Sequence, residues 1–426
     1  MKRRLFLAAT LATLFSPATL AAPAKKADPA KKTRNATSKK SKKNARVSTK
    51  KPAARKSAPL PVAEPQTSAC HSVLDNAPPG SSATRLPPVQ APELPDEWHL
   101  WEIVFTLQRP AARGEQRLWL PLPMRQDTRW QRNLGARWQY NGETGALVRL
   151  PDDALEAFYG EWPEGLAPRL VLTARVAAAN RRFDVSRRSV PPEREDLVRK
   201  FLAASRQIPN TGRIYSLARA IVGRVVDPVA QARLLYQWVS NHADYNPDLP
   251  GYGQGDVNAL IATLPEPVPP DWRYAGASAD ITGFFVALCR ALGIPARRVF
   301  GIRVGASQTL ESLGLSGTDA TRAFHCRAEC YVPGYSWIGV DPASVCQASV
   351  TENLKADDAK RLALQKLLFG FWEMNWVAFN TSEDIRLPEG DAELPFLALP
   401  RLVNPEGELD GSAPNAFGYR IESRPR

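Results

Sequence analysis

An apolar stripe at helical spacing constrains the fold of this 426-residue chain more than any other feature. Its members are Ile281, Phe284, Phe285, Leu288 and Leu292. A stripe of this kind belongs in a protein core. It runs into Gly293-Ile294-Pro295, which ends a helix, and residues 297–304 then read as a strand. We therefore expect a buried helix that starts near Ser278 and feeds a strand.

Residues 324–341 predict a β-hairpin with two chemically different faces. Along the first strand the polar side chains are His325, Arg327, Glu329 and Tyr331, and the residues between them are apolar or small. Pro333-Gly334 supplies a turn, and residues 337–341 return. Because side chains alternate across a strand, we expect the apolar face to pack inward and His325 to lie on the other face.

The register of this hairpin decides how His325 meets Asp341. A turn centred on Pro333 places the two residues directly opposite each other. A turn centred one residue later places them diagonally, still within contact. In either register the Asp341 carboxylate can hold one imidazole nitrogen and leave the other free as a base. The plainer interpretation is that Asp341-Pro342 is a strand-ending turn and His325 a structural residue.

The chain has five cysteines, Cys70, Cys289, Cys326, Cys330 and Cys346, so at least one thiol is unpaired within a single chain. Cys326 and Cys330 fall on the inward face of the hairpin, where we expect small core residues rather than a reactive pair. The same alternation places these cysteines and His325 on opposite faces of the strand, which disfavours a shared metal site. We expect no metal and no organic cofactor.

Three regions with different patterns follow the N-terminal part of the chain. Residues 93–190 contain short strand-like runs, which predict a small β-sandwich. Residues 191–352 turn helical and then strand-like, and we expect the functional core there. Residues 353–426 are expected to complete that core, with a helix near 357–367 and a further strand at 371–379.

The N-terminal part predicts export. Lys2, Arg3 and Arg4 precede an apolar run, and small residues allow cleavage after Ala21, so residues 1–21 read as a signal peptide. The general secretory route is favoured over the twin-arginine route. Residues 22–92 are rich in Lys, Pro and Ala and predict a disordered basic linker. We expect a periplasmic or secreted protein without a transmembrane span in its mature form.

The net charge of +13 does not indicate a nucleic-acid partner. Residues 1–56 hold 17 of the 56 Lys and Arg residues and a single acidic residue, Asp28. The rest of the chain is therefore close to neutral. The basic linker is either a solvated spacer or an electrostatic contact with anionic envelope surfaces.

Three blocks of the sequence together resemble the transglutaminase-like superfamily, a papain-like cysteine-enzyme fold. They are GASAD at 276–280 with LCRALGIPAR at 288–297, the strand from His325 to Val332, and WIGVDP at 337–342. The resemblance covers roughly residues 227–345. It implies an α+β core in which a helix opens the cleft against an antiparallel sheet, preceded here by the small β-sandwich.

The resemblance also implies a catalytic triad, with one departure. His325 and Asp341 match the family's histidine and aspartate, whereas Ser278 stands where the family has its cysteine. A thiol ionises at a helix N-terminus beside an imidazolium, but a serine hydroxyl needs a base to take its proton during attack. Cys289 cannot replace the missing thiol, because it lies about three helical turns away.

Ser278 therefore has two readings, a nucleophile or a helix cap, and Asp280 in the first turn suits the helix dipole under either. If the site is active, the Ser278 N–H is the natural first oxyanion donor and Tyr245 is a candidate second. One hypothesis is acyl transfer or amide or ester hydrolysis by Ser278, His325 and Asp341. The alternative is a catalytically inactive relative that binds a peptide, a cell-envelope polymer or a protein partner in the retained cleft.

Overall fold

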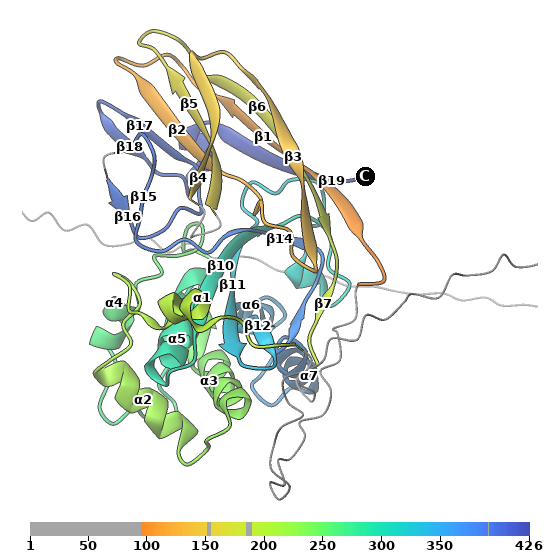
Figure 1. Ribbon diagram of the computed structural model, residues 1–426, viewed down its shortest axis with the longest axis vertical. Helices are drawn as coiled ribbons and strands as arrows, with labels where there is room; N and C mark the ends of the chain where they lie inside the picture. The colour runs from red at the N-terminus through yellow and green to blue at the C-terminus, as the bar shows by residue number, and fades with distance from the viewer. Residues whose placement is uncertain (1–94, 151–154, 185–189, 391) are drawn as a thin grey trace, which may run out of the picture. The chain divides into compact units, whose positions relative to one another are not determined.

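The computed structural model describes residues 95–150, 155–184, 190–390 and 392–426 (Figure 1). The predicted signal peptide and basic linker, with Cys70, lie outside these residues. Within them, no helix is long and apolar enough to cross a bilayer.

Two antiparallel sheets form the expected β-sandwich. One sheet has the order β19-β1-β6-β3 and the other β18-β17-β2-β5-β4. The strands from the N-terminal half are β1 (His99–Gln108), β2 (Gln116–Pro121), β3 (Gln131–Tyr140), β4 (Thr144–Leu150), β5 (Leu155–Trp162) and β6 (Arg169–Ala178). Strand β6 alternates buried and less buried residues, the pattern of a strand that packs on one side.

The C-terminal segment is shared between the two parts of the fold, which differs from our expectation that residues 353–426 complete the core. Strands β17 (Arg401–Asn404) and β18 (Gly407–Leu409) join one sandwich sheet, and β19 (Tyr419–Pro425) pairs with β1 in the other. Edge strands of an open sheet need partners, and these distant segments supply them.

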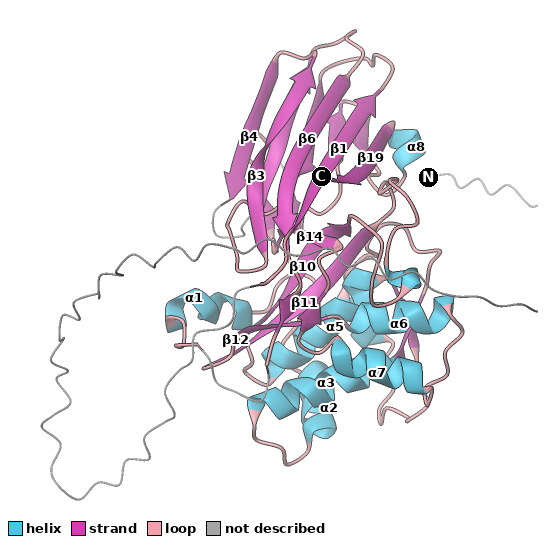
Figure 2. Cartoon of the chain, turned by 90° about the vertical axis from the view of Figure 1, so that its right-hand side faces the viewer, coloured by secondary structure: helices cyan, strands magenta, loops and turns pink. Residues whose placement is uncertain are grey.

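The second part is a four-stranded antiparallel sheet of order β12-β11-β10-β14. Its strands are β10 (Ala296–Arg303), β11 (Phe324–Val332), β12 (Ser336–Val340) and β14 (Trp376–Asn380). The helices that gather beside this sheet in Figure 2 are α2 (Arg213–Val222), α3 (Pro228–His242), α5 (Ser278–Ala291), α6 (Pro342–Thr351) and α7 (Ala359–Leu367).

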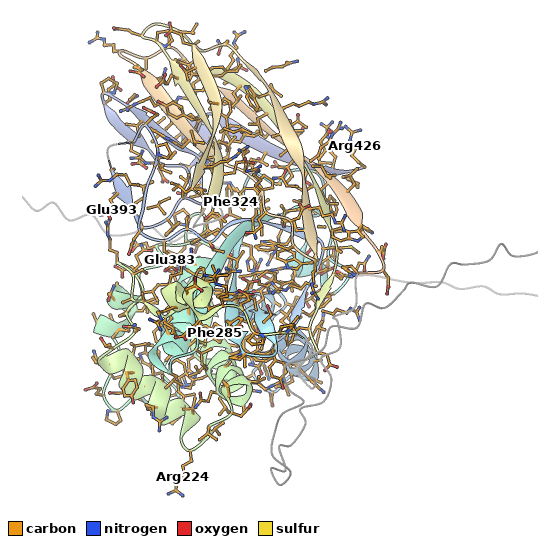
Figure 3. All side chains as sticks on the ribbon, in the orientation of Figure 1. Arg224, Phe285, Phe324, Glu383, Glu393 and Arg426 are labelled. Carbon is orange, nitrogen blue, oxygen red and sulfur yellow. The ribbon has the colours of Figure 1, made fainter. Side chains whose placement is uncertain are left out.

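The predicted central helix is confirmed as α5, which packs on β10 and β11. The stripe is buried as expected except for Leu292, which is half-buried, and Phe285 lies in the interior of the helical layer (Figure 3). The helix is buried on almost every side, since all its residues from Ser278 to Arg290 are buried. It therefore holds its first turn in a fixed place against the sheet.

Both faces of β11 are buried, not only the apolar one. The apolar face packs against the helices, where the Thr282 hydroxyl of α5 lies 3.2 Å from the Cys326 sulfur. The polar face is covered by Trp372, Trp376 and the short strand β7 (Arg181–Arg182), which pairs with β13 (Phe371–Trp372). Every charge on this face must therefore be paired within the protein.

Candidate functional site

The start of α5 is fixed by a carboxylate rather than by a serine cap. Ala277 is the N-cap residue, and Ser278 is the first residue of the helix. The Asp280 side chain accepts the N–H groups of Ala277 (2.9 Å) and Gly255 (2.7 Å), which ties a preceding loop to the helix. Gly253 in that loop has a φ of +84°, and a side chain there would collide with Asp280. Ser278 is thus free of a capping role.

The Ser278 hydroxyl meets β11 one residue after His325. Its oxygen accepts the backbone N–H of Cys326 at 3.0 Å, the residue that follows His325 in β11. No other hydrogen bond of this hydroxyl is formed within the described residues, and the residue is 1% exposed. The structure therefore brings Ser278 to the residue that follows the predicted histidine, but the Ser278 hydroxyl is hydrogen-bonded to a backbone N–H and not to the imidazole.

His325 and Asp341 meet as the hairpin predicts, in the diagonal register. Ala328 pairs with Val340, and Val332 pairs with Ser336, so the turn centres on Gly334. The Nε2 atom of His325 lies 3.1 and 3.0 Å from the two carboxylate oxygens of Asp341.

Asp341 also caps a helix that the sequence interpretation missed. Its side chain accepts the Ser344 N–H at 2.8 Å, with Pro342 in the first turn of α6. The strand-ending turn is therefore a helix start, and α3 begins in the same way at Asp227-Pro228. Asp341 further accepts the Arg327 Nε at 3.1 Å and the Ser344 hydroxyl at 2.7 Å.

Arg303, at the end of β10, belongs to the candidate site and was not indicated by the sequence. Its Nη2 lies 3.4 Å from the Nδ1 of His325 and donates to the Ser344 hydroxyl (3.1 Å) and to Gln347 (2.8 Å). A guanidinium can only donate, so Nδ1 is the acceptor and the ring proton sits on Nε2, toward Asp341. No short motif marks this arginine, which lies 22 residues before its partner.

Burial is the main reason why the ring of His325 is neutral. The pKa of His325 is about 4: burial lowers it most, Asp341 opposes this shift, and the charge of Arg303 adds to it. The pKa of Asp341 is held well below its usual range by His325 and Arg327, against its own burial. Burial also lowers the pKa of Arg327 to about 10. At neutral pH the site holds a carboxylate, a neutral imidazole and two guanidinium groups.

Tyr245 lies near the start of α5 through a short parallel pair. Strand β8 (Ala243–Tyr245) pairs with β9 (Tyr274–Gly276) and sets Tyr245 level with Gly276, two residues before Ser278. Burial raises the pKa of Tyr245, and the nearby charge of Arg303 lowers it. The structure thus brings Tyr245 to the same region as the other three predicted residues.

The thiols of the described residues are free and buried. Burial raises the pKa of Cys326, Cys330 and Cys346 to about 12, so each stays protonated at neutral pH. The prediction that Cys326 and Cys330 are buried core residues is confirmed. Across the described part of the chain, no group of three or more His, Cys, Asp or Glu side chains is placed to hold a metal ion.

Both ring nitrogens of His325 therefore have partners other than Ser278. Nδ1 faces Arg303, and Nε2 faces Asp341 and Ser344. The side chains of His325 and Asp341 are 2% and 0% exposed. Chemically this is a buried ion network that includes an imidazole, and Arg303 connects it to a cavity of about 750 Å³.

Comparisons with known proteins agree with the interpretation of the central region. Residues 215–342 match the family model of the transglutaminase-like superfamily. The chain is also similar to an uncharacterized protein of Haemophilus influenzae, with 28% identity over 340 residues that cover 75% of this chain and 88% of the relative.

Two solved structures show partial likeness. A putative cysteine protease from Cytophaga hutchinsonii covers 78% of this chain and 91% of its own, with 16% identity and a TM-score of 0.46. The periplasmic domain of TgpA from Pseudomonas aeruginosa covers 60% of this chain and 91% of its own, with 18% identity and a TM-score of 0.30. The identification of the domain rests on the family model.

Proposed function

We propose that this protein, which carries a transglutaminase-like domain at residues 215–342, binds its ligand without performing acyl transfer. The domain has the fold of the superfamily, and the sequence resemblance matches His325 and Asp341 to the family's histidine and aspartate. The contact between Arg303 and the Nδ1 of His325 is the observation that carries the proposal.

A serine nucleophile depends on a base that removes its proton during attack. Nδ1 of His325 is the only ring nitrogen that Asp341 leaves available, and the Arg303 guanidinium lies 3.4 Å from it. A proton on Nδ1 would add a positive charge directly beside that cation. A histidine pKa of about 4 also lies well below the value that suits a general base at neutral pH.

Burial supports the same proposal. Ser278 is 1% exposed, and its hydroxyl oxygen already accepts the N–H of Cys326. A substrate carbonyl must come within about 3–3.5 Å of a nucleophile to react. Attack would therefore require both an opening of the site and a new partner for that N–H.

A second candidate function is serine-dependent hydrolysis or acyl transfer in the cell envelope. The direct contact of His325 with Asp341 favours it, because that pair is the orienting half of a triad. Ser278 would be the nucleophile, its N–H the first oxyanion donor and Tyr245 the second. This function requires Arg303 to withdraw from His325 when substrate binds.

The predicted signal peptide places either function outside the cytoplasm, in the periplasm or secreted. Ligands there include peptides, proteins and cell-envelope polymers, and the basic linker would add an electrostatic contact with anionic envelope surfaces. A nucleic-acid ligand is disfavoured, because the chain beyond the basic linker is near neutral.

Covalent labelling separates the two functions. The purified protein, Ser278→Ala and Ser278→Cys are treated with a fluorescent serine-directed phosphonate and with iodoacetamide, and are assayed on a panel of amide and ester substrates. We expect no phosphonate labelling or turnover for the wild type, as for Ser278→Ala. Labelling of the wild type that disappears in Ser278→Ala would establish the serine enzyme and overturn the proposal.

A further inference from the structure

A cavity of about 750 Å³ lies beyond the buried network, and none of Ser278, His325 and Asp341 lines it. Its walls come from the end of β10, the loop that follows, α6, and the segment from the short helix α8 (Pro414–Phe417) into β19. Its volume is within the usual range for a ligand site. Both the sheet of the core and the sandwich contribute to it.

The walls of this cavity are held in place by the backbone. The Ala320 N–H donates to the Ile421 carbonyl at 2.9 Å, and the Ser423 N–H donates to the Thr318 carbonyl at 2.8 Å. The Thr321 hydroxyl accepts the Ile421 N–H at 3.0 Å. The loop is thus bound along β19, and a ligand would meet a preformed site rather than a loop that it must order.

The lining carries more positive than negative charge. Arg303, Arg322 and Arg420 contribute cations, and Asp319 contributes the one carboxylate of the lining. The pKa of Asp319 is lowered first by hydrogen bonds from Thr321 and then by the charges of Arg420 and Arg322. Arg420 is paired with Glu422 at 3.1 Å. Within the described residues, Arg322 makes no hydrogen bond or ion pair, so its charge is available to a ligand.

Arg303 is the deepest of these cations and is only partly satisfied. The residue is 6% exposed, and its Nε is buried without a hydrogen-bond partner within the described residues. Its Nη2 alone serves His325, Ser344 and Gln347. A buried guanidinium with an unused donor is costly unless an anion comes to it.

We propose that the cavity binds the carboxylate of a short peptide, with Arg303 at its inner end and Arg322 at its rim as the cationic partners. A guanidinium matches a carboxylate in charge and geometry. Asp319 repels a ligand of higher negative charge, which favours a single carboxylate over a phosphate. The Gln347 side chain, whose oxygen accepts from Arg303, has an amide NH₂ group that can donate to a peptide carbonyl. This inference rests on the proposed binding function and names its site and ligand class.

Calorimetric titration of the purified protein with three acetylated tetrapeptides tests the ligand class. They are tetra-alanine with a free C-terminal carboxylate, the same peptide as its C-terminal amide, and an amidated peptide with one glutamate. Binding of the first alone identifies a C-terminal carboxylate, and binding of the third identifies an acidic side chain. Binding of none of them, or equal binding of the neutral amide, would overturn the proposal.

Matched arginine variants test the site itself. Arg322→Gln is expected to weaken binding about tenfold, because a hydrogen bond to a charged group is lost. Arg224→Gln removes the same charge at the C-terminal end of the α2 region, far from Phe324 next to the cavity loop (Figure 3), and is expected to bind like the wild type. Equal affinities for both variants would place the peptide elsewhere.

The labelling and titration experiments together separate this inference from the proposed function. Phosphonate labelling at Ser278 would remove the non-catalytic function whatever the peptides do. Absence of labelling, together with peptide binding that Arg322→Gln leaves unchanged, would remove only the inference about the cavity.

Discussion

Two buried ion clusters lie on the polar face of β11, and they are built in the same way. One is centred on Glu329 of this strand, and the other on Asp341, which follows β12. In the first, Glu329 is held by Arg181 and by Arg297, whose Nε lies 2.6 Å from it. In the second, Asp341 is held directly by Arg327 at 3.1 Å, and Arg303 reaches it through Ser344 and His325. Each cluster has one carboxylate and two guanidinium groups.

The two clusters differ in their access to water and in the histidine. The arginines of the Glu329 cluster keep 12% and 23% of their side chains exposed, and that cluster contains no imidazole. The Asp341 cluster is closed except where Arg303 meets the cavity. The comparison teaches that the residues of the predicted triad are assembled like a structural ion cluster, with His325 inserted into it. The added histidine and cavity, rather than Ser278, are what distinguish it.

The largest expected difference between the clusters is in stability. Asp341→Asn leaves two buried guanidinium groups without a carboxylate, and we expect a loss of about 3–5 kcal/mol in the free energy of unfolding. Glu329→Gln should cost about 1–2 kcal/mol, because Arg181 and Arg297 can turn toward water. Urea unfolding at pH 7, followed by tryptophan fluorescence, measures both. Glu97→Gln, at an exposed pair with His99, is the control and should change stability by less than about 0.5 kcal/mol. Equal losses at Asp341 and Glu329 would show that the closed environment of the second cluster has no energetic effect.

The histidine should give the Asp341 cluster a pH dependence that begins near pH 6.5, whereas the lowered pKa of Glu329 makes its cluster depend on pH only at more acid values. The pKa of His325 is about 4 in the folded protein and about 6.5 when the chain unfolds. Between these values the unfolded chain binds a proton that the folded protein does not, so stability falls as the pH is lowered from 6.5 to 4. The contribution of His325 is up to about 3 kcal/mol, and it is fully present above pH 6.5.

The stability profile of His325→Gln should be flatter over this window than that of the wild type. His99→Gln is the matched control and should keep the wild-type slope, and the contribution of His242, whose pKa burial also lowers, remains in both variants. Urea midpoints at half-unit pH steps measure the slopes. Parallel profiles for the wild type and His325→Gln would refute a depressed histidine pKa.

Local patterns predicted much of the fold and part of the site. The stripe of α5 and the alternation of β11 are short-range, so they predicted the helix, the hairpin and the meeting of His325 with Asp341. The pairing of β19 with β1 joins residues about 320 positions apart, and no local pattern encodes it. Arg303 was missed for a related reason, since its role comes from the β10–β11 register that sets Gly301 opposite His325.

The burial of the polar face of β11 could not be predicted from the sequence either. The alternation of residues along β11 predicts one apolar face that packs on the core and one charged face that does not. Trp372 and Trp376 arrive from a distant segment and cover it, with the Arg327 guanidinium 4.5 Å from the ring centre of Trp376. Tertiary packing therefore converted a polar strand face into a buried network.

The protonation of His325 tests most directly whether Arg303 keeps the imidazole from acting as a base. Heteronuclear NMR of ¹⁵N-histidine-labelled protein follows the ring nitrogens with pH, and His325→Gln assigns the signal. In the wild type the ring should stay neutral at pH 5, with the proton on Nε2. Arg303→Gln should raise the pKa of His325, because a cation beside Nδ1 is removed, whereas Arg303→Lys should keep it low. A wild-type ring that titrates near pH 6.5, or that titrates identically in Arg303→Gln, would contradict the proposal that Arg303 keeps the imidazole from acting as a base.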